Sequence, residues 1–184
     1  GLTNLALKMD GLTVKLVYDG GELQQASTRG DGEIGEDITH NIPAFINVPL
    51  TVPYKDRLVI TGEAHIRIDD FEKLRTSILD RNGEPYKTPR NLASGSVRTL
   101  NPAVCKERCV SFIPFNVLEG LDYEAVIGDS RSAKLSKLKD YGFGYCDSYT
   151  IDKSATEEQI ETYIECLQTI AREKMIPIDG IVAV

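Results

Sequence analysis

Tryptophan is absent from this chain of 184 residues, and the side chains that most often bind metals are scarce. Histidine occurs only at His40 and His65, neither of them near a cysteine in the sequence, and both are expected to be structural or exposed. The cysteines are Cys105, Cys109, Cys146 and Cys166. They form no Cys-x-x-Cys pair, so a zinc centre is disfavoured and no metal ligand set is expected. Free thiols in a reducing compartment are the expected state.

Long apolar segments are also absent. The sequence has no run of about 18 apolar residues, so no membrane-spanning helix is expected. It has no stretch with the basic head, apolar centre and small-residue cleavage site of a secretory signal. Together with the free thiols, these absences lead us to expect a cytoplasmic protein.

The chain has fewer basic than acidic residues. Asp and Glu outnumber Lys and Arg by 28 to 21, which gives a net charge of −7. An acidic chain of this kind is not expected to grip nucleic acid over its whole surface. Local contact with phosphates is not excluded, because basic residues gather in one stretch. They are Lys87, Arg90, Arg98, Lys106 and Arg108.

What is present indicates one globular α+β domain over residues 1–184. Hydrophobic residues make up 41% of the chain and charged residues 27%, which suits a domain with a buried core. Apolar runs and apolar–polar alternation predict strands over 12–18, 22–28, 58–66, 109–117 and 177–184. Spacings of three and four predict helices over 69–80, 129–141 and 156–173. Gly1 directly precedes a short apolar run, so we expect a piece of a longer chain.

One lysine stands out by its surroundings. Lys8 follows the apolar residues Leu5–Leu7, and Asp10 and Gly11 come soon after it. Side chains two apart on a strand point to the same side, so Lys8 and Asp10 can meet at the mouth of a pocket. Burial or a neighbouring positive charge can make a lysine amine nucleophilic near neutral pH. Taken alone, however, the pattern is more often a surface lysine beside a turn.

Three segments resemble one enzyme family. Lys8-Met9-Asp10-Gly11 resembles the Lys-x-Asp-Gly signature of the covalent nucleotidyltransferases, which include DNA ligases and messenger-RNA capping enzymes. Residues 26–39 and 88–98 resemble the adenylation domain of bacterial NAD-dependent DNA ligases. This resemblance extends from Lys8 to the last residue. It implies the nucleotidyltransferase fold of the ATP-grasp-like ligases and capping enzymes, with antiparallel sheets flanked by helices.

The resemblance also implies a reaction. In the family, the lysine attacks the α-phosphorus of NAD, expels nicotinamide mononucleotide and forms lysyl-AMP. AMP then passes to the 5′-phosphate of nicked double-stranded DNA. Such transfer needs in-line placement and cations against developing negative charge, which arginines and Mg²⁺ supply. The implied small molecules are therefore NAD, its adenine nucleotide and Mg²⁺, the implied partner is nicked DNA, and no obligate protein partner is inferred.

By position, the resemblance assigns roles to particular residues. Lys8 is the nucleophile, and Asp10 orients and tunes it. The residues matched to nucleotide binding are Arg29, Glu63, Phe115, Arg172, Asp179 and Gly180. Arg90 and Arg98 are matched to phosphates of the nucleotide or the DNA. Without the resemblance, a glutamate such as Glu63 is more commonly an edge-strand carboxylate in water, a ring such as Phe115 is far more often part of the core, and an arginine pair is usually a solvated face. Only for residues 29–37 are a ligand-binding loop and a solvated turn equally favoured.

Three positions depart from the family's pattern. Ala6 stands where a glutamate usually reaches adenine, Thr61 stands where an arginine is usual, and Val184 stands where a lysine usually contacts the nucleotide. Loss of a phosphate-region cation costs several kcal/mol of transition-state stabilisation. A second hypothesis is therefore a nucleotide- or nucleic-acid-binding module that has lost the chemistry. A third, an ATP-using relative, is disfavoured because such relatives lack segments 29–39 and 88–98.

Overall fold

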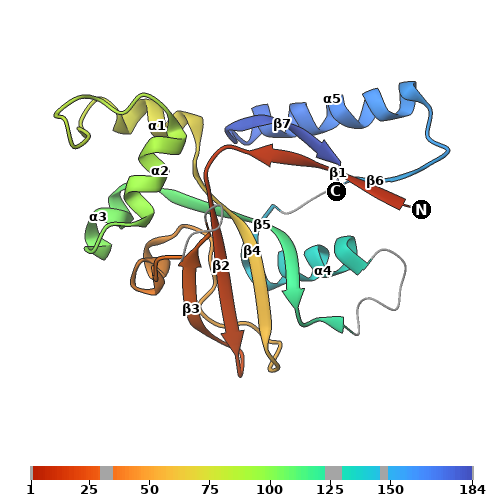
Figure 1. Cartoon of the computed structure of the whole chain (residues 1–184), viewed down its shortest axis with the longest axis horizontal. Helices are drawn as coiled ribbons and strands as arrows, with labels where there is room; N and C mark the ends of the chain where they lie inside the picture. The colour runs from red at the N-terminus through yellow and green to blue at the C-terminus, as the bar shows by residue number, and fades with distance from the viewer. Residues whose placement is uncertain (1, 30–34, 123–129, 146–148, 184) are drawn as a thin grey trace.

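The computed structural model describes residues 2–29, 35–122, 130–145 and 149–183 (Figure 1). Its strands are β1 (Leu2–Met9), β2 (Leu12–Asp19), β3 (Glu22–Thr28), β4 (Leu58–Ile66), β5 (Val110–Glu119), β6 (Tyr149–Asp152) and β7 (Ile178–Ala183). Its α-helices are α1 (Ile68–Leu74), α2 (Pro89–Val97), α3 (Pro102–Glu107), α4 (Ser130–Leu138) and α5 (Glu157–Glu173). A 3₁₀ helix η1 (Thr39–Ala44) and a π-helical segment η3 (Lys139–Phe143) complete the described elements.

The strands form two antiparallel sheets. One sheet has the order β3-β2-β4-β5, and the other has the order β6-β1-β7. Helices α2 and α4 lie beside the larger sheet, α3 packs against η1 and α2, and α5 lies along the smaller sheet (Figure 1). This arrangement confirms the predicted α+β fold with antiparallel sheets flanked by helices. No helix among the described residues is both long and apolar enough to cross a membrane.

The β2–β3 hairpin begins the larger sheet. Asp19 pairs with Glu22 across the two-residue turn Gly20-Gly21, whose φ angles are 62° and 82°. Two successive positive φ angles suit the twist of a tight hairpin and favour glycine at both positions. The core under this sheet is formed by inward-facing strand residues and by one face of α2. Fully buried members include Val14, Leu16, Tyr18, Leu58, Ile60, Leu92 and Val97.

A second, smaller core lies between the three-stranded sheet and α5. Leu5, Leu7 and Met9 alternate along β1 and pack against Leu167 and Ala171 of the helix. The N-terminus of α5 is closed by the predicted capping box, in which the side chains of Thr156 and Gln159 each accept a hydrogen bond from the other's backbone N–H. Because one face of β1 is buried against α5, the intervening side chains of β1 are turned the opposite way.

Some predicted elements differ from those in the structure. The helix expected over 69–80 ends at Leu74, and Leu79 forms an isolated bridge with Pro85 instead. Segment 88–98, which no periodicity marked as helical, contains α2. Thr88 caps it by accepting from the Asn91 N–H at 3.1 Å, and Pro89 occupies the first turn. The short elements α3 and β6 were not predicted, because each is under seven residues long and has no clear period.

Candidate functional site

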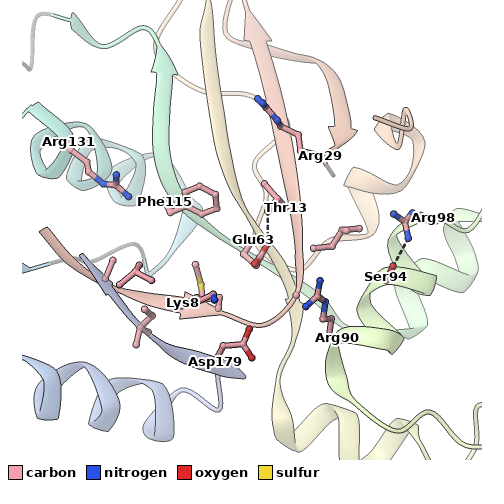
Figure 2. Close-up of a pocket in the computed structure, with 16 residues that line it drawn as sticks. Lys8, Thr13, Arg29, Glu63, Arg90, Ser94, Arg98, Phe115, Arg131 and Asp179 are labelled. Atoms are coloured by element: carbon pink, nitrogen blue, oxygen red, sulfur yellow. Dashed lines mark hydrogen bonds between the residues drawn. The ribbon is translucent and has the colours of Figure 1, made fainter. Parts of the chain in front are cut away.

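A cavity of about 810 Å³ opens where the two sheets meet (Figure 2). Strands of both sheets contribute to its wall, together with α2 and α4. The charged residues that line it are Lys8, Arg29, Glu63, Arg90, Arg98, Arg131 and Asp179. Cations outnumber acids in this set although the whole chain carries a net charge of −7. The cavity is therefore suited to an anionic ligand such as a nucleotide phosphate.

Lys8 reaches the cavity from β1. Leu7 and Met9 on either side of it are buried in the smaller core, so Lys8 projects from the opposite face of the strand. Its side chain is exposed in the cavity (Figure 2). The backbone of Lys8 pairs with Gly180 of β7. An approaching ligand has free access to this amine from the cavity side.

A bulge places Asp179 beside Lys8. Lys8 pairs with Gly180, whereas the next residue, Met9, pairs with Ile178, so Asp179 is the extra residue on β7. A bulge of this kind redirects one side chain out of the regular alternation. The exposed carboxylate of Asp179 consequently lines the cavity close to Lys8 (Figure 2).

Asp10 lies at the junction between the sheets and does not line the cavity itself. Its backbone N–H donates to the Pro177 carbonyl at 2.9 Å, and its Oδ1 lies 3.7 Å from Nη1 of Arg90. Partial burial is the main cause that raises the pKa of Asp10, the charge of Asp179 raises it further, and Arg90 opposes both. Asp10 thus connects α2 with the segment that precedes β7.

Glu63 occupies the floor of the cavity on β4. Its Oε1 accepts a hydrogen bond from Oγ1 of Thr13 at 3.1 Å (Figure 2). Burial raises the pKa of Glu63 to about 7, although the Thr13 hydrogen bond and Arg90 both lower it. The Glu63 carboxylate lines the cavity, where it can accept a hydrogen bond from a hydroxyl group of a ligand.

The basic wall comes from α2 and from the end of β3. Arg90 and Arg98 stand eight residues apart, at the two ends of α2, and both are exposed to the cavity. Arg98 Nη1 donates to Ser94 Oγ at 2.6 Å, and its Nε lies 3.5 Å from a carboxylate oxygen of Glu36. Arg29 is held by its backbone N–H, which donates to the Thr13 carbonyl at 2.9 Å. The guanidinium groups of these arginines are suited to phosphate oxygens.

Comparison with known proteins decides the family. Residues 2–184 match the model for the NAD-dependent DNA ligase adenylation domain. The chain belongs to this family. It is 41% identical to the DNA ligase of Ruminiclostridium cellulolyticum over 178 residues, which cover 97% of this chain and 26% of the relative. The DNA ligase of Lachnoclostridium phytofermentans is 40% identical over the same shares of the two chains. The chain thus spans 26% of the length of each of these curated relatives.

A comparison of folds agrees with this assignment. A solved structure described as Pmar-Lig_Pre superposes with a TM-score of 0.50 at 13% identity, covering 100% of this chain and 38% of the other. At that identity the likeness concerns the fold alone. The expected nucleotidyltransferase fold is confirmed for this adenylation-domain chain.

Phe115 and Arg131 form the end of the cavity opposite α2 (Figure 2). Phe115 is half-buried on β5 and packs against the smaller core, so its ring serves both as core and as cavity wall. The basic side chain of Arg131 comes from α4. Sequence reasoning missed Arg131, Thr13 and Ser94. No pattern distinguishes Arg131 from the lysines of α4, and Thr13 carries no charge that would draw attention to it.

The structure does not bring Arg172 to this cavity. Arg172 lines a separate hollow of about 630 Å³, together with Arg75 and Lys87, and its Nη2 donates to Thr169 Oγ1 at 3.2 Å. The reason lies in the helix period, because Ala171 faces the core under β1 and the next residue is turned about 100° away. The role matched to Arg172 by resemblance therefore lacks support from its position.

The structure shows where some of the other predicted features lie, and the rest fall outside the described residues. Gly180 pairs with Lys8, and a Cβ added to it would meet no atom within 4 Å, so the backbone there is open. Cys105, Cys109 and Cys166 are free thiols, as predicted. In the part of the chain that the structure describes, no group of three or more His, Cys, Asp or Glu side chains is placed to hold a metal ion. Cys146, residues 30–34 of the glycine-rich loop and Val184 lie outside the described residues.

Proposed function

We propose that this chain is the nucleotidyltransferase unit of an NAD-dependent DNA ligase. Lys8 takes AMP from NAD, and the AMP is then passed to the 5′-phosphate of nicked double-stranded DNA. The observation that supports this most is the convergence on one cavity of Lys8, four arginines, Glu63 and Asp179, which come from separate elements of the chain. Residues 1–184 act as one unit in this proposal, and the cytoplasm is its expected place because the free thiols suit a reducing compartment.

The first step joins the lysine to the nucleotide. The neutral amine of Lys8 attacks the α-phosphorus of NAD, so that an N–P bond forms and the P–O bond to nicotinamide mononucleotide breaks. The leaving mononucleotide takes the electron pair, and the amine gives up a proton to the surrounding water. Arg29, Arg90 and Arg98 stabilise the negative charge that develops on the phosphate oxygens. Asp10 and Asp179 favour the correct placement of the amine.

The remaining contacts bind the nucleoside. Glu63 accepts a hydrogen bond from a ribose hydroxyl, and Phe115 offers a ring against which adenine stacks. Arg131 is a further candidate contact at that end of the cavity. A cavity of about 810 Å³ accommodates a nucleotide of this size.

Mg²⁺ fits the site only when the substrate phosphates supply part of its coordination. The oxygen donors near Lys8 are carboxylates, which Mg²⁺ accepts, but the described residues provide no ready-made ligand set. Mg²⁺ characteristically keeps several waters and binds through one or two carboxylates together with substrate phosphates. Glu63 and Asp179 are the residues that would hold it, and it would supply neutralisation of phosphate charge.

Nicked DNA is the proposed partner of the basic segment that contains α2 and α3. Lys106 lies on α3 and Arg108 directly after it, and α3 contacts α2, which carries Arg90. Because the chain as a whole is acidic, this segment is where phosphate contact is concentrated. We expect binding to weaken with rising salt.

Mass spectrometry of the complete protein tests the proposal. Incubation with NAD and Mg²⁺ is expected to add the mass of AMP to Lys8, and Lys8→Arg is expected to prevent this while keeping the charge. ATP in place of NAD is expected to give no adduct. The alternative, a binding module without the chemistry, is favoured by Ala6, which lines the cavity but carries no polar side chain. Calorimetric binding of an adenine nucleotide without any adduct on the wild-type protein would establish that alternative.

A further inference from the structure

The proposed contacts with the nucleotide leave the choice of base open. Phe115 is half-buried and lines the cavity, and stacking on its ring is available to every purine because each base has a π-face. Glu63 is assigned to a ribose hydroxyl, which is the same in every ribonucleotide. Any choice between bases must therefore come from the side chains that meet the edge of the purine near Phe115.

Two of these side chains belong to paired strands. Ala6 and Val182 lie directly opposite each other on β1 and β7, two residues along the strands from the pair of Lys8 and Gly180. Residues two apart on a strand point to the same side, so Ala6 shares the cavity face with Lys8. Ala6 and Val182 both line the cavity. Their side chains are entirely apolar, so neither side chain can accept a hydrogen bond from a base.

Arg131 supplies the polar side chain at this end of the cavity (Figure 2). It lies on α4, which packs beside β5, the strand that carries Phe115. A guanidinium has five N–H donors and no acceptor. The side chains with oxygen acceptors that line the cavity are Thr13, Glu63, Ser94 and Asp179. Figure 2 shows the ring of Phe115 between Arg131 and Glu63, so the side chains described at the Arg131 end offer hydrogen-bond donors alone.

We propose that the cavity does not require the 6-amino group of adenine and accepts a 6-oxopurine, such as hypoxanthine, in the dinucleotide substrate. The inference rests on the proposed function and deepens it, because it names the class of base that the site takes. Along one edge, adenine presents N7 as an acceptor and its 6-amino group as a donor, whereas a 6-oxopurine presents two acceptors, N7 and O6. The guanidinium of Arg131 can make two hydrogen bonds to the second edge but only one to the first, where donor faces donor.

The reaction at Lys8 is the same for either base. The amine forms an N–P bond to the α-phosphorus, and the P–O bond to nicotinamide mononucleotide breaks. The leaving mononucleotide takes the electron pair of that bond, and the amine gives up a proton to water. A hypoxanthine dinucleotide therefore yields lysyl-IMP where NAD yields lysyl-AMP. The ratio of the two products reports on the contacts of the base.

Competition between two dinucleotides tests the inference. The complete protein is incubated with Mg²⁺ and equal concentrations of NAD and nicotinamide hypoxanthine dinucleotide. Mass spectrometry of the peptide that contains Lys8 then separates the AMP adduct from the IMP adduct. We expect at least one IMP adduct for about every ten AMP adducts. A larger excess of the AMP adduct would overturn the inference, because it would show that the site reads the 6-amino group.

Two variants locate the discrimination between the bases. Arg131→Met is expected to weaken binding of the hypoxanthine dinucleotide about ten-fold more than binding of NAD, because the 6-oxopurine loses two hydrogen bonds and adenine loses one. Ala6→Glu is expected to favour NAD by about ten-fold or more, because a carboxylate accepts from the 6-amino group and repels O6. Lys137→Met, on α4 outside this cavity, is the matched control and is expected to leave the ratio of affinities unchanged.

Calorimetry in a Lys8→Arg background measures both affinities without adduct formation. An unchanged ratio of the two affinities in Arg131→Met would overturn the inference, even if both affinities fall together. Ala6 is buried, and if Ala6→Glu does not fold, Arg131→Met decides the question by itself. If the wild-type protein forms no adduct with either dinucleotide, the proposed function fails, whereas the ratio of affinities still decides which base the cavity takes.

Discussion

Arg90 and Asp10 approach within 3.7 Å although they belong to parts of the fold with different tasks. Arg90 stands at the start of α2 in the basic wall of the cavity, and Asp10 lies in the connection from β1 to β2. The backbone N–H of Asp10 also donates to the carbonyl of Pro177, in the segment before β7. The pair therefore links three elements around Lys8.

Arg90→Gln is expected to affect activity far more than stability. The side chain of Arg90 is 62% exposed, and exposed ion pairs contribute less than about 1 kcal/mol to folding. Removal of a cation that faces a transferring phosphate costs roughly ten- to a thousand-fold in rate. The melting temperature and the rate of lysyl-AMP formation would be measured together. A large fall in melting temperature with an unchanged rate would show that Arg90 is structural.

Gly62→Ala is expected to destabilise the fold by about 1 to 3 kcal/mol. A Cβ at this position would overlap the Phe112 ring and lie 2.5 Å from the Ile113 carbonyl oxygen, both on the neighbouring strand β5. Gly180→Ala is the matched control for stability, because a Cβ there meets nothing within 4 Å. Urea denaturation of the two variants measures the difference. Equal free energies of unfolding for the two variants would mean that β4 and β5 can move apart at position 62 without loss of stability.

Sequence reasoning anticipated the larger sheet well. The spans 22–28 and 58–66 were predicted and match β3 and β4 in the structure. They could be predicted because alternation of apolar and polar residues, bounded by glycine turns, indicates a strand with one buried face. The helix over 69–80 was predicted too long. The three-and-four spacing of Phe71, Leu74 and Ile78 continues into a turn, and nothing local in the sequence marks where the helix hydrogen bonds stop.

The candidate site was anticipated only where a motif marks it. Asp179 was matched to the site by the resemblance, but its bulge follows from the pairing of β1 with β7, which local sequence does not encode. Arg131 and Thr13 enter the cavity through tertiary packing alone. Arg172 was matched to the site by a loose alignment, and the rotation of α5 turns it elsewhere. Roles for these residues remain predictions for experiment.

Two groups, the buried His65 and the half-buried Glu63, are expected to change the free energy of unfolding with pH in opposite directions. Burial lowers the pKa of His65 to about 4 from an ordinary 6.5, so the unfolded chain binds the extra proton between these values. His65 therefore destabilises the fold as pH falls from 6.5 towards 4. Burial raises the pKa of Glu63 from 4.5 to about 7, so the folded chain binds the extra proton and stability falls as pH rises from 4.5 towards 7.

Single variants separate the two effects. His65→Gln is expected to remove the loss of stability at low pH, which amounts to about 2 to 3 kcal/mol between pH 7 and pH 4.5. Glu63→Gln is expected to remove the loss of stability that occurs as pH rises from 4.5 towards 7. Urea denaturation at pH 4.5, 5.5, 6.5 and 7.5 measures both slopes. Unchanged slopes in the two variants would mean that neither group titrates differently in the folded and unfolded chains.

Arg131→Met is expected to weaken nucleotide binding by about ten-fold, because a charge-assisted hydrogen bond contributes about 1.5 kcal/mol or more. The guanidinium lines the cavity beside Phe115 (Figure 2), and methionine keeps much of its apolar length. Calorimetry with NAD in a Lys8→Arg background measures affinity without interference from adduct formation. Lys137→Met removes one positive charge from the same helix outside this cavity, and it controls for long-range electrostatics. Equal affinities for the two variants would mean that Arg131 acts only through its charge, whereas a selective loss at Arg131 would identify a direct contact at the end of the cavity that no sequence motif marks.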